Sequence, residues 1–469
     1  MDLPDLKSLT DHESPIYLQL YWRFRNAIAT GKLAPGDRVP SIRSLASELN
    51  LARGTVEAAY QMLSSEGYLI GRGAAGTVVS PQLDGRVSAT TPVGSSVLPR
   101  PGQIKLAGSK PLQLGLPALD AFPRKTWVRL AGRNLRAMNV ADMVNADPNG
   151  YEPLRRAIAA YLAVSRGIAC TPDQVFVTAG YRGALELIRR TLFRHGDRGW
   201  FEDPGYLHAR RFLEDAGMQL VPLPVDDDGL NVESGLRHAV DARFAVVTPT
   251  HQSPSGVALS LPRRLALLDW AQAQRAWIIE DDYDSEFRYD GRPLPPLKSL
   301  DHGGRVLYAG TFSKVLYPGL RLAYLVVPEH EIGKFRNSMA QLGSSPVLFQ
   351  ATVADFMEQG HFARHIKKMR SLYSTRRDYL VQALAQVFGD MLLVPERAGG
   401  IHVVAHLKPK YNDKAFAAAA NAKGLAIMAL SEWCIRRRSP VGLLMGFANI
   451  ATPEQALKHV RRLREAFDH

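Results

Sequence analysis

Apolar residues recur at helical spacing in the first part of the chain. Tyr17, Leu20, Phe24 and Ile28 are three or four residues apart, which predicts a helix that ends near residue 31. A second, short helix is expected to open at Ser41, and a third to run from about residue 53 to residue 66. Two helices joined by a turn of about four residues indicate a helix-turn-helix.

Two short apolar runs, residues 67–70 and 77–79, follow the third helix and are typical of strands in a hairpin. The loop between them is rich in glycine, which allows a close approach to another backbone. A β-hairpin that directly follows the second helix of a helix-turn-helix is called a wing. We therefore predict a winged helix-turn-helix over residues 12–80, followed by a linker over the Pro-, Ser-, Thr- and Gly-rich residues 81–103.

The remaining residues, 104–469, alternate between short apolar runs and stretches of helical periodicity. Strands separated by helices usually form parallel sheets, so this segment predicts an α/β domain with a mostly parallel central sheet. The expected strands include residues 174–177, 244–247, 276–279 and 305–308.

Composition narrows the class of protein. The chain has 469 residues, of which 46% are apolar and 22% charged, as is usual for a soluble protein of more than one domain. It has no apolar run of about 18 residues and no apolar core near its acidic N-terminus, so we expect neither a membrane span nor a signal peptide. Its two cysteines, Cys170 and Cys434, lie far apart in sequence, which fits a cytoplasmic protein without disulfides.

The formal net charge of +13 is compatible with a nucleic acid as partner, but many soluble proteins are basic, so charge alone does not establish one. Residues 1–80 nevertheless hold eight Lys and Arg against eight Asp and Glu, so any attraction to DNA must come from where these residues lie. The second helix of a helix-turn-helix enters the major groove by its N-terminal end, and a wing can reach the minor groove. The alternative is a helical oligomerisation domain whose arginines are only solvated. The candidate DNA contacts are Arg38, Ser41, Arg43, Arg53, Thr55, Arg72 and Gly73.

Lys314 has the most informative chemical surroundings in the chain. It follows Thr311 and Ser313, and Arg321 comes one short loop later. A lysine forms a Schiff base with an aldehyde, while hydroxyls and a guanidinium hold a phosphate. Pyridoxal 5'-phosphate (PLP) needs both, and it also needs a carboxylate that keeps its pyridine nitrogen protonated.

Carboxylates follow the expected strand that ends near residue 279, at the end of a strand where an α/β sheet places its ligand contacts. Spacing alone does not decide which of them would face a cofactor. They are Asp281, Asp282 and Asp284.

A second candidate for the phosphate lies at residues 178–185, which follow a strand and open a helix. Exposed amides at a helix N-terminus bind anions, so Gly180, Tyr181 and Arg182 are candidate donors. A glycine turn of this kind is also a common packing device, and the pattern leaves that alternative open.

The first segment resembles the GntR class of winged helix regulators. Residues 14–20, 31–41 and 66–69 carry the resemblance, which implies binding of a double-stranded DNA operator through the candidate contacts. Two positions depart from the family's common Val-Ser-Arg-x-Thr start of the recognition helix. Ala52 lacks a capping hydroxyl, which costs a helix about 1 kcal/mol, and Gly54 has no side chain to contact a phosphate.

The third segment resembles a fold-type I aminotransferase, and the whole chain is similar to the MocR-type regulators, which join these two kinds of domain. The resemblance implies that Lys314 holds PLP, that Asp281 pairs with the pyridine nitrogen, and that Tyr283 donates to the phenolic oxygen of the ring. Tyr206 would stack on the ring face. Residues 248–256 resemble the loop beside the cofactor, where His251 and Ser253 either face the ring or only shape a turn.

The same resemblance bears on enzymatic activity. Aminotransferases hold the substrate carboxylate with an arginine, and Leu444 stands at that position in this chain. We therefore expect no efficient transamination, although a slow half-reaction stays open, as does replacement of the arginine by residues 436–438. His208 is a candidate contact for an effector, which we expect to be PLP or an amine or amino acid that reacts with it.

Two further functions stay open on the sequence alone. One is a working aminotransferase with an accessory N-terminal domain, and the other is a DNA-binding protein whose large domain only dimerises. Fold-type I domains usually form homodimers, so the resemblance also implies a homodimer with two winged helices for two half-sites. The loop at residues 145–151 resembles one that reaches into the partner's site, but Asn145 stands where Tyr is common.

Overall fold

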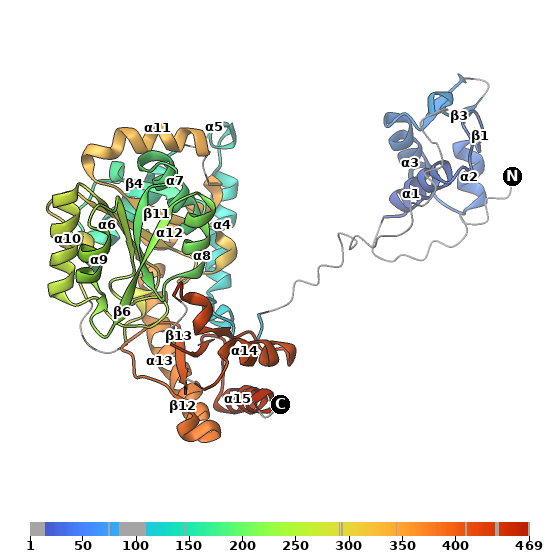
Figure 1. The fold of residues 1–469 in the computed structure, drawn as a ribbon. Coiled ribbons are helices and arrows are strands. Elements are labelled where there is room, and N and C mark those ends of the chain that lie inside the picture. The colour runs from blue at the N-terminus through green and yellow to red at the C-terminus, as the bar shows by residue number, and fades with distance from the viewer. Residues whose placement is uncertain are drawn as a thin grey trace. The chain divides into compact units, whose positions relative to one another are not determined.

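The structure, a computed structural model, describes residues 15–73, 76–83, 109–144, 147–289, 291, 294–343, 345–408, 410–436 and 440–467. The chain divides between Leu106 and Ala107 into two compact units (Figure 1). Of the predicted linker, residues 81–103, the structure describes only the short 3-10 helix η3 Pro81–Leu83, and the rest lies outside the described residues.

The N-terminal unit combines three helices with a small antiparallel sheet. Its helices are α1 Ile16–Ala29, α2 Ile42–Glu48 and α3 Arg53–Ser65. Its strands, β1 Arg38–Val39, β2 Leu69–Gly71 and β3 Thr77–Val79, form a sheet in the order β1-β3-β2. The winged helix-turn-helix is confirmed. The apolar pattern did not predict β1, because two residues show no periodicity.

The apolar faces that the sequence predicts meet in the core of this unit. Leu20, Phe24 and Ile28 of α1 are buried together with Val56 and Leu63 of α3. Each such side chain contributes roughly 1.5–3 kcal/mol through its removal from water. The core therefore fixes α3 against α1 and leaves the opposite face of α3 free for a partner.

The two helices of the helix-turn-helix differ at their N-termini. The Ser44 amide donates to the Ser41 hydroxyl at 3.1 Å, which caps α2. The N-cap of α3 is Ala52, whose side chain accepts no such bond, as the sequence predicts. Because an absent cap costs about 1 kcal/mol, α3 begins with a weakly held first turn.

The second unit is built on an eight-stranded sheet in the order β4-β11-β10-β9-β8-β5-β6-β7. From β10 to β6 the neighbouring strands are parallel, while β11 and β7 pair antiparallel. The predicted mostly parallel α/β sheet is confirmed. The strands are β4 Val175–Thr178, β5 Arg198–Asp203, β6 Gln219–Asp226, β7 Gly229–Leu230, β8 Phe244–Val247, β9 Trp277–Asp282, β10 Val306–Thr311 and β11 Ala323–Val326.

Helices cover both faces of this sheet (Figure 1). Ile279 of β9 packs with α7 Tyr181–Leu192, α8 Leu207–Asp215 and α11 Ile332–Leu342. Its neighbour Ile278 packs with α9 Val232–Ala239 and α10 Leu261–Gln274 on the other face. Because both faces are buried, the strands are continuous apolar runs rather than alternating ones.

A smaller antiparallel sheet lies in the C-terminal part of the chain. Its order is β12-β13-β15-β14, with β12 Leu392–Leu393, β13 His402–Leu407, β14 Met428–Ala429 and β15 Gly442–Gly446. The remaining helices are α4 Arg124–Ala137, α5 Val140–Val144, α6 Glu152–Arg166, α12 Val347–Glu358, α13 His361–Phe388, α14 Asp413–Ala422 and α15 Pro453–Phe467. Within the described residues, every helix is too short or too polar to cross a membrane.

Candidate functional site

One cavity of about 630 Å³ brings together nearly all the residues that the sequence offers for a cofactor. It lies beside the ends of β9 and β10 and the start of α7. His251 is the exception, because it lines two other pockets instead. The predicted residues in the cavity wall are Gly180, Tyr181, Arg182, Tyr206, Ser253, Asp281, Tyr283, Thr311, Ser313, Lys314 and Arg321.

Lys314 follows β10 and points its amine into this cavity. Nζ donates to the carbonyl oxygen of Gly115 at 3.0 Å. Burial lowers the pKa of Lys314, and the carboxylates of Asp284 and Asp281 act in the opposite direction. A lysine with a lowered pKa holds more of its amine in the neutral form that attacks an aldehyde.

Asp281 is the carboxylate that β9 presents to the cavity. Burial raises its pKa to about 8, while the nearby Tyr181 hydroxyl acts to lower it. Asp282 is on the opposite face of the strand, where the Tyr308 hydroxyl donates to it at 2.5 Å and Arg166 lies 3.5 Å away. Asp284 lies against His251. Of the three carboxylates, Asp281 alone lines this cavity, because side chains alternate along a strand.

An anion cradle lies at the N-terminus of α7. Gly180 has a φ of 77° and caps the helix without a side chain. A Cβ at Gly180 would stand 3.7 Å from the guanidinium carbon of Arg321. The first amides of a helix have no partner within the helix, so Tyr181 and Arg182 offer them to a ligand. Thr311 and Ser313 line the same cavity.

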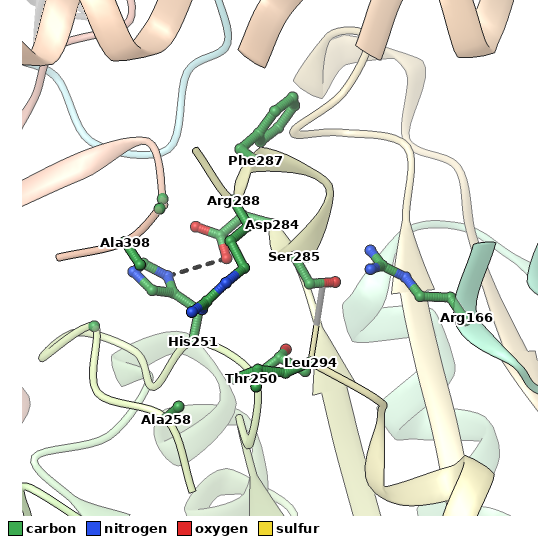
Figure 2. Close-up of a pocket in the computed structure, with 13 residues that line it drawn as sticks. Arg166, Thr250, His251, Ala258, Asp284, Ser285, Phe287, Arg288, Leu294 and Ala398 are labelled. Carbon is green, nitrogen blue, oxygen red and sulfur yellow. Dashed lines mark hydrogen bonds and ion pairs between the residues drawn. The ribbon is translucent and has the colours of Figure 1, made fainter. Parts of the chain in front are cut away.

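His251 lies within hydrogen-bond distance of Tyr283. Its Nδ1 is 3.0 Å from the Tyr283 hydroxyl and 3.1 Å from a carboxylate oxygen of Asp284. Figure 2 shows His251 and Asp284 joined by a hydrogen bond on one side of a small pocket, with Arg166 on the opposite side. His251 therefore reaches the cofactor cavity through the hydroxyl of Tyr283.

Among the residues of the cavity wall that sequence reasoning missed, two lie close to the chemistry of Lys314. The carbonyl of Gly115 holds the lysine amine, and His402 of β13 lies in the wall. Burial lowers the pKa of His402 to about 4, so its ring is neutral at neutral pH. No sequence signal marks either residue, because both come from segments far from Lys314 that only the fold brings near.

The cavity fits PLP by the chemistry of its donors. It offers a buried amine at Lys314, a buried carboxyl group at Asp281 whose ionised form a nearby cation would stabilise, and helix amides at residues 180–182 beside Arg321. These are the groups that an aldehyde, a pyridine nitrogen and a phosphate require.

The position that the sequence compares with a carboxylate-binding arginine is apolar in the structure. Leu444 of β15 is fully buried and lines the cavity. Arg436 is engaged elsewhere, since it donates to the carbonyl of Pro222 at 2.6 Å and lies 3.8 Å from Asp203. Arg437 and Arg438 lie outside the described residues, as does Asn145.

The predicted DNA contacts lie at the surface of the N-terminal unit. Ser41 also caps α2, and Thr55 in the first turn of α3 is half-buried. The guanidinium of Arg38 lies beside Gly76 of the wing, 3.0 Å from where a Cβ of that glycine would stand. The exposed members are Arg38, Ser41, Arg43, Arg53, Arg72 and Gly73.

Two family models match the chain. Residues 16–79 match the bacterial regulatory proteins of the gntR family, and residues 119–439 match aminotransferase class I and II. The probable rhizopine catabolism regulatory protein MocR of Rhizobium meliloti is 36% identical over 97% of this chain and 94% of its own length. The chain belongs to the MocR-type regulators of the GntR family.

Other relatives agree with this family. The HTH-type pyridoxine biosynthesis transcriptional regulator PdxR of Corynebacterium glutamicum is 35% identical, over 96% of this chain and 95% of its own. The multiple substrate aminotransferase of Thermococcus profundus matches the fold with a TM-score of 0.70 and 29% identity, covering 79% of this chain and 96% of that one. This MocR-type chain is therefore a DNA-binding transcriptional regulator that carries a PLP-binding, aminotransferase-like domain.

Proposed function

We propose that this regulator binds its operator through the N-terminal unit and senses PLP, or an amine or amino acid that reacts with PLP, in the cavity around Lys314. The observation that carries the proposal is the meeting of Lys314, Asp281 and the anion cradle in one cavity. The name of the PdxR relative, which refers to pyridoxine biosynthesis, supports PLP itself as a ligand.

In this proposal residues 12–80 are the DNA-binding domain, 81–103 the linker and 104–469 the effector domain of a cytoplasmic protein. Arg53 and Thr55 contact base edges from the first turn of α3. The phosphate contacts come from Arg38, Ser41 and Arg43, and the wing reaches the minor groove with Arg72 and Gly73. The exposure of these side chains, except the half-buried Thr55, supports the assignment.

When bound, PLP supplies an aldehyde carbon that reacts reversibly with primary amines. The residues of the cavity prepare for this chemistry. The carbonyl of Gly115 orients the Lys314 amine, and Asp281 keeps a proton on a ring nitrogen. Tyr283 offers its hydroxyl to the ring oxygen, and His251 with Asp284 holds that hydroxyl in place. Because Leu444 gives no cation for a carboxylate, we propose no efficient transamination.

We also propose that the regulator is a homodimer. The consecutive helices α4 and α5 carry several exposed large apolar side chains, of which Val140 is 75% exposed. Such a patch usually marks an interface. A second copy with the same patch would cover it by two-fold symmetry. The exposed residues are Val128, Leu135, Val140, Met143 and Val144.

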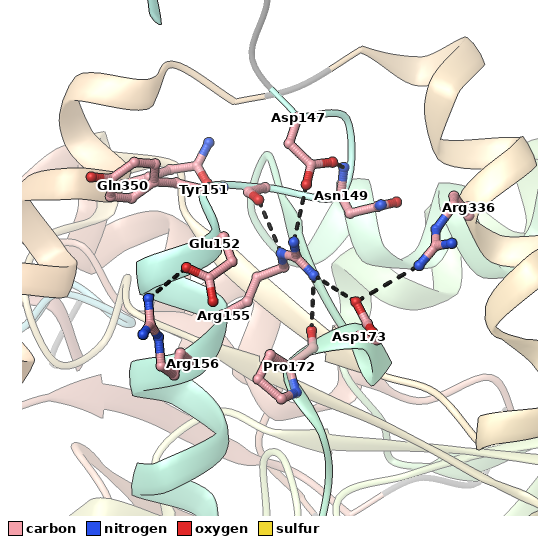
Figure 3. Close-up of polar contacts among 11 residues, drawn as sticks. Asp147, Asn149, Tyr151, Glu152, Arg155, Arg156, Pro172, Asp173, Arg336 and Gln350 are labelled. Atoms are coloured by element: carbon pink, nitrogen blue, oxygen red, sulfur yellow. Dashed lines mark hydrogen bonds and ion pairs between the residues drawn. The ribbon is translucent and has the colours of Figure 1, made fainter. Parts of the chain in front are cut away.

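Polar contacts hold residues 147–151, which come between this patch and α6, and they support the same proposal (Figure 3). Arg155 of α6 donates to the carbonyls of Gly150 and Pro172 and to the carboxylate of Asp147, at 3.0, 3.1 and 3.0 Å. The Tyr151 amide donates to the Gln350 side chain at 2.7 Å. A loop held this firmly can present its residues to a partner without an entropic cost.

We propose that binding of PLP or of an amine at Lys314 changes the spacing of the two winged helices of a dimer on DNA. The test is fluorescence anisotropy with duplex DNA from upstream of the gene, at stated salt, with and without PLP. We expect PLP to change the affinity at least threefold for the wild type and not for Lys314→Ala. Arg53→Ala is expected to lose binding in both states. An identical affinity with and without PLP would contradict the proposed sensing.

A further inference from the structure

The cavity around Lys314 has one wall that carries no charge. Four of its lining side chains, Leu114, Met428, Trp433 and Leu444, pack in a single apolar cluster together with Tyr206. Met428 and Leu444 stand directly opposite each other on the paired strands β14 and β15. These residues therefore form one continuous apolar wall of the cavity.

This wall lies next to the reactive amine. Leu114 precedes Gly115, whose carbonyl accepts the hydrogen bond from Lys314 Nζ at 3.0 Å. The backbone of that segment is fixed, since the Gly446 amide donates to the carbonyl of Leu112 at 2.9 Å. A molecule that reaches Lys314 with its nitrogen thus places its remaining atoms within reach of the apolar wall.

The cations of the cavity come from other elements. Arg321 belongs to the anion cradle, while Arg182 and Arg211 are exposed on α7 and α8. His402 is neutral at neutral pH, because burial lowers its pKa to about 4. A carboxylate against the apolar wall would lose its water without gaining a partner, which is costly.

We propose that this wall holds the body of the effector, and that the effector is a primary amine with an apolar or aromatic body and no carboxylate on the carbon that bears the nitrogen. The inference rests on the proposed function, because it takes Lys314 with PLP as the group to which the amine is drawn.

The test uses the full-length protein loaded with PLP and three matched probes: 2-phenylethylamine, L-phenylalanine and 5-aminopentanoate. The readouts are the shift of the visible absorption band of bound PLP and the anisotropy of operator DNA. We expect the half-saturating concentration of 2-phenylethylamine to be at least tenfold below that of the other two.

Variants of the wall give a second readout. Met428 is partly exposed, so Met428→Arg is expected to fold and to bring a guanidinium to the wall. It is expected to reduce the preference for 2-phenylethylamine over L-phenylalanine at least fivefold, and the volume-conserving Met428→Leu is expected to keep it. Leu444→Arg, at a fully buried position, is the second variant and is scored only if it retains the PLP band.

The possible failures are distinct. If L-phenylalanine or 5-aminopentanoate acts at the same or a lower concentration than 2-phenylethylamine, or if no amine shifts the band, the inference is overturned while PLP binding stands. If the protein gives no PLP band at all, the proposed function fails and this inference falls with it.

Discussion

At the scale of single residues, Asp281 shows how the cavity is prepared for a cation. Its pKa is raised to about 8 because the carboxyl group is buried. An acid whose folded-state pKa is raised holds its proton more tightly when folded, so its contribution to stability is present at low pH. That contribution is lost as the pH rises from about 4, the usual value of aspartate, through 8.

The first prediction follows from this shift. Without PLP, Asp281→Asn removes the cost of ionising the buried carboxyl group. The free energy of unfolding of the variant, relative to that of the wild type, is therefore expected to increase between pH 5 and pH 9, by on the order of 4 kcal/mol. Thermal melting of the PLP-free protein at the two pH values measures it. The same variant is expected to weaken PLP binding. A difference that does not change with pH would contradict the assigned burial, and Asp215→Asn at the exposed rim is the control.

Sequence chemistry singled out Lys314 and its neighbours, because hydroxyls and an arginine beside a lysine gain meaning from the carboxylates that follow the strand ending near residue 279. It did not decide between Asp281, Asp282 and Asp284, since that depends on where β9 ends and which face each side chain takes. The role of His251 was also beyond reach. Its place beside Tyr283 follows from contacts between segments that are far apart in the chain.

At the scale of elements, the missing cap of α3 gives the second prediction. Ala52→Ser supplies the hydroxyl that the first turn lacks and is expected to stabilise the N-terminal unit by about 1 kcal/mol. Ser41→Ala removes an existing cap from α2 and is expected to cost a similar amount. Amide hydrogen exchange of α2 and α3 in the full chain, measured at several denaturant concentrations, compares the two. Destabilisation by Ala52→Ser would show that α3 does not start at this residue.

The apolar patch on α4 and α5 gives the third prediction. Val140→Glu combined with Val128→Glu places charges in the proposed interface and is expected to shift the protein from dimer to monomer, with a change in dissociation constant of at least a hundredfold. Analytical ultracentrifugation measures the state. Val164→Glu in α6, where valine is 91% exposed, is the matched control and is expected to stay dimeric. If the double variant remains a dimer, the dimer interface does not include the exposed apolar residues of α4 and α5.

Apolar periodicity predicted the helices and strands well where they are long and bury only one face. The three helices of the N-terminal unit follow from apolar residues at helical spacing, and the strands of the large sheet follow from short apolar runs. Short strands such as β1 and β14 were not predicted, because two residues carry no pattern and are set by their partners.

At the scale of the whole molecule, the chain joins a unit that contacts DNA to one that binds PLP. The sequence predicts both kinds of domain, since each has its own pattern and its own resemblance. The net charge of +13 did not identify the DNA-contacting unit, because residues 1–80 carry equal numbers of acidic and basic side chains. We propose that a few exposed arginines, Arg38, Arg43, Arg53 and Arg72, carry that function instead.

The most direct test of the account is the visible absorbance of the purified full-length protein after addition of PLP. We predict a new absorption band for the wild type and for Lys334→Ala, whose lysine is exposed and paired with Glu331. Lys314→Ala is predicted to give only the spectrum of free PLP. The same band in Lys314→Ala, or no band in the wild type, would contradict the account.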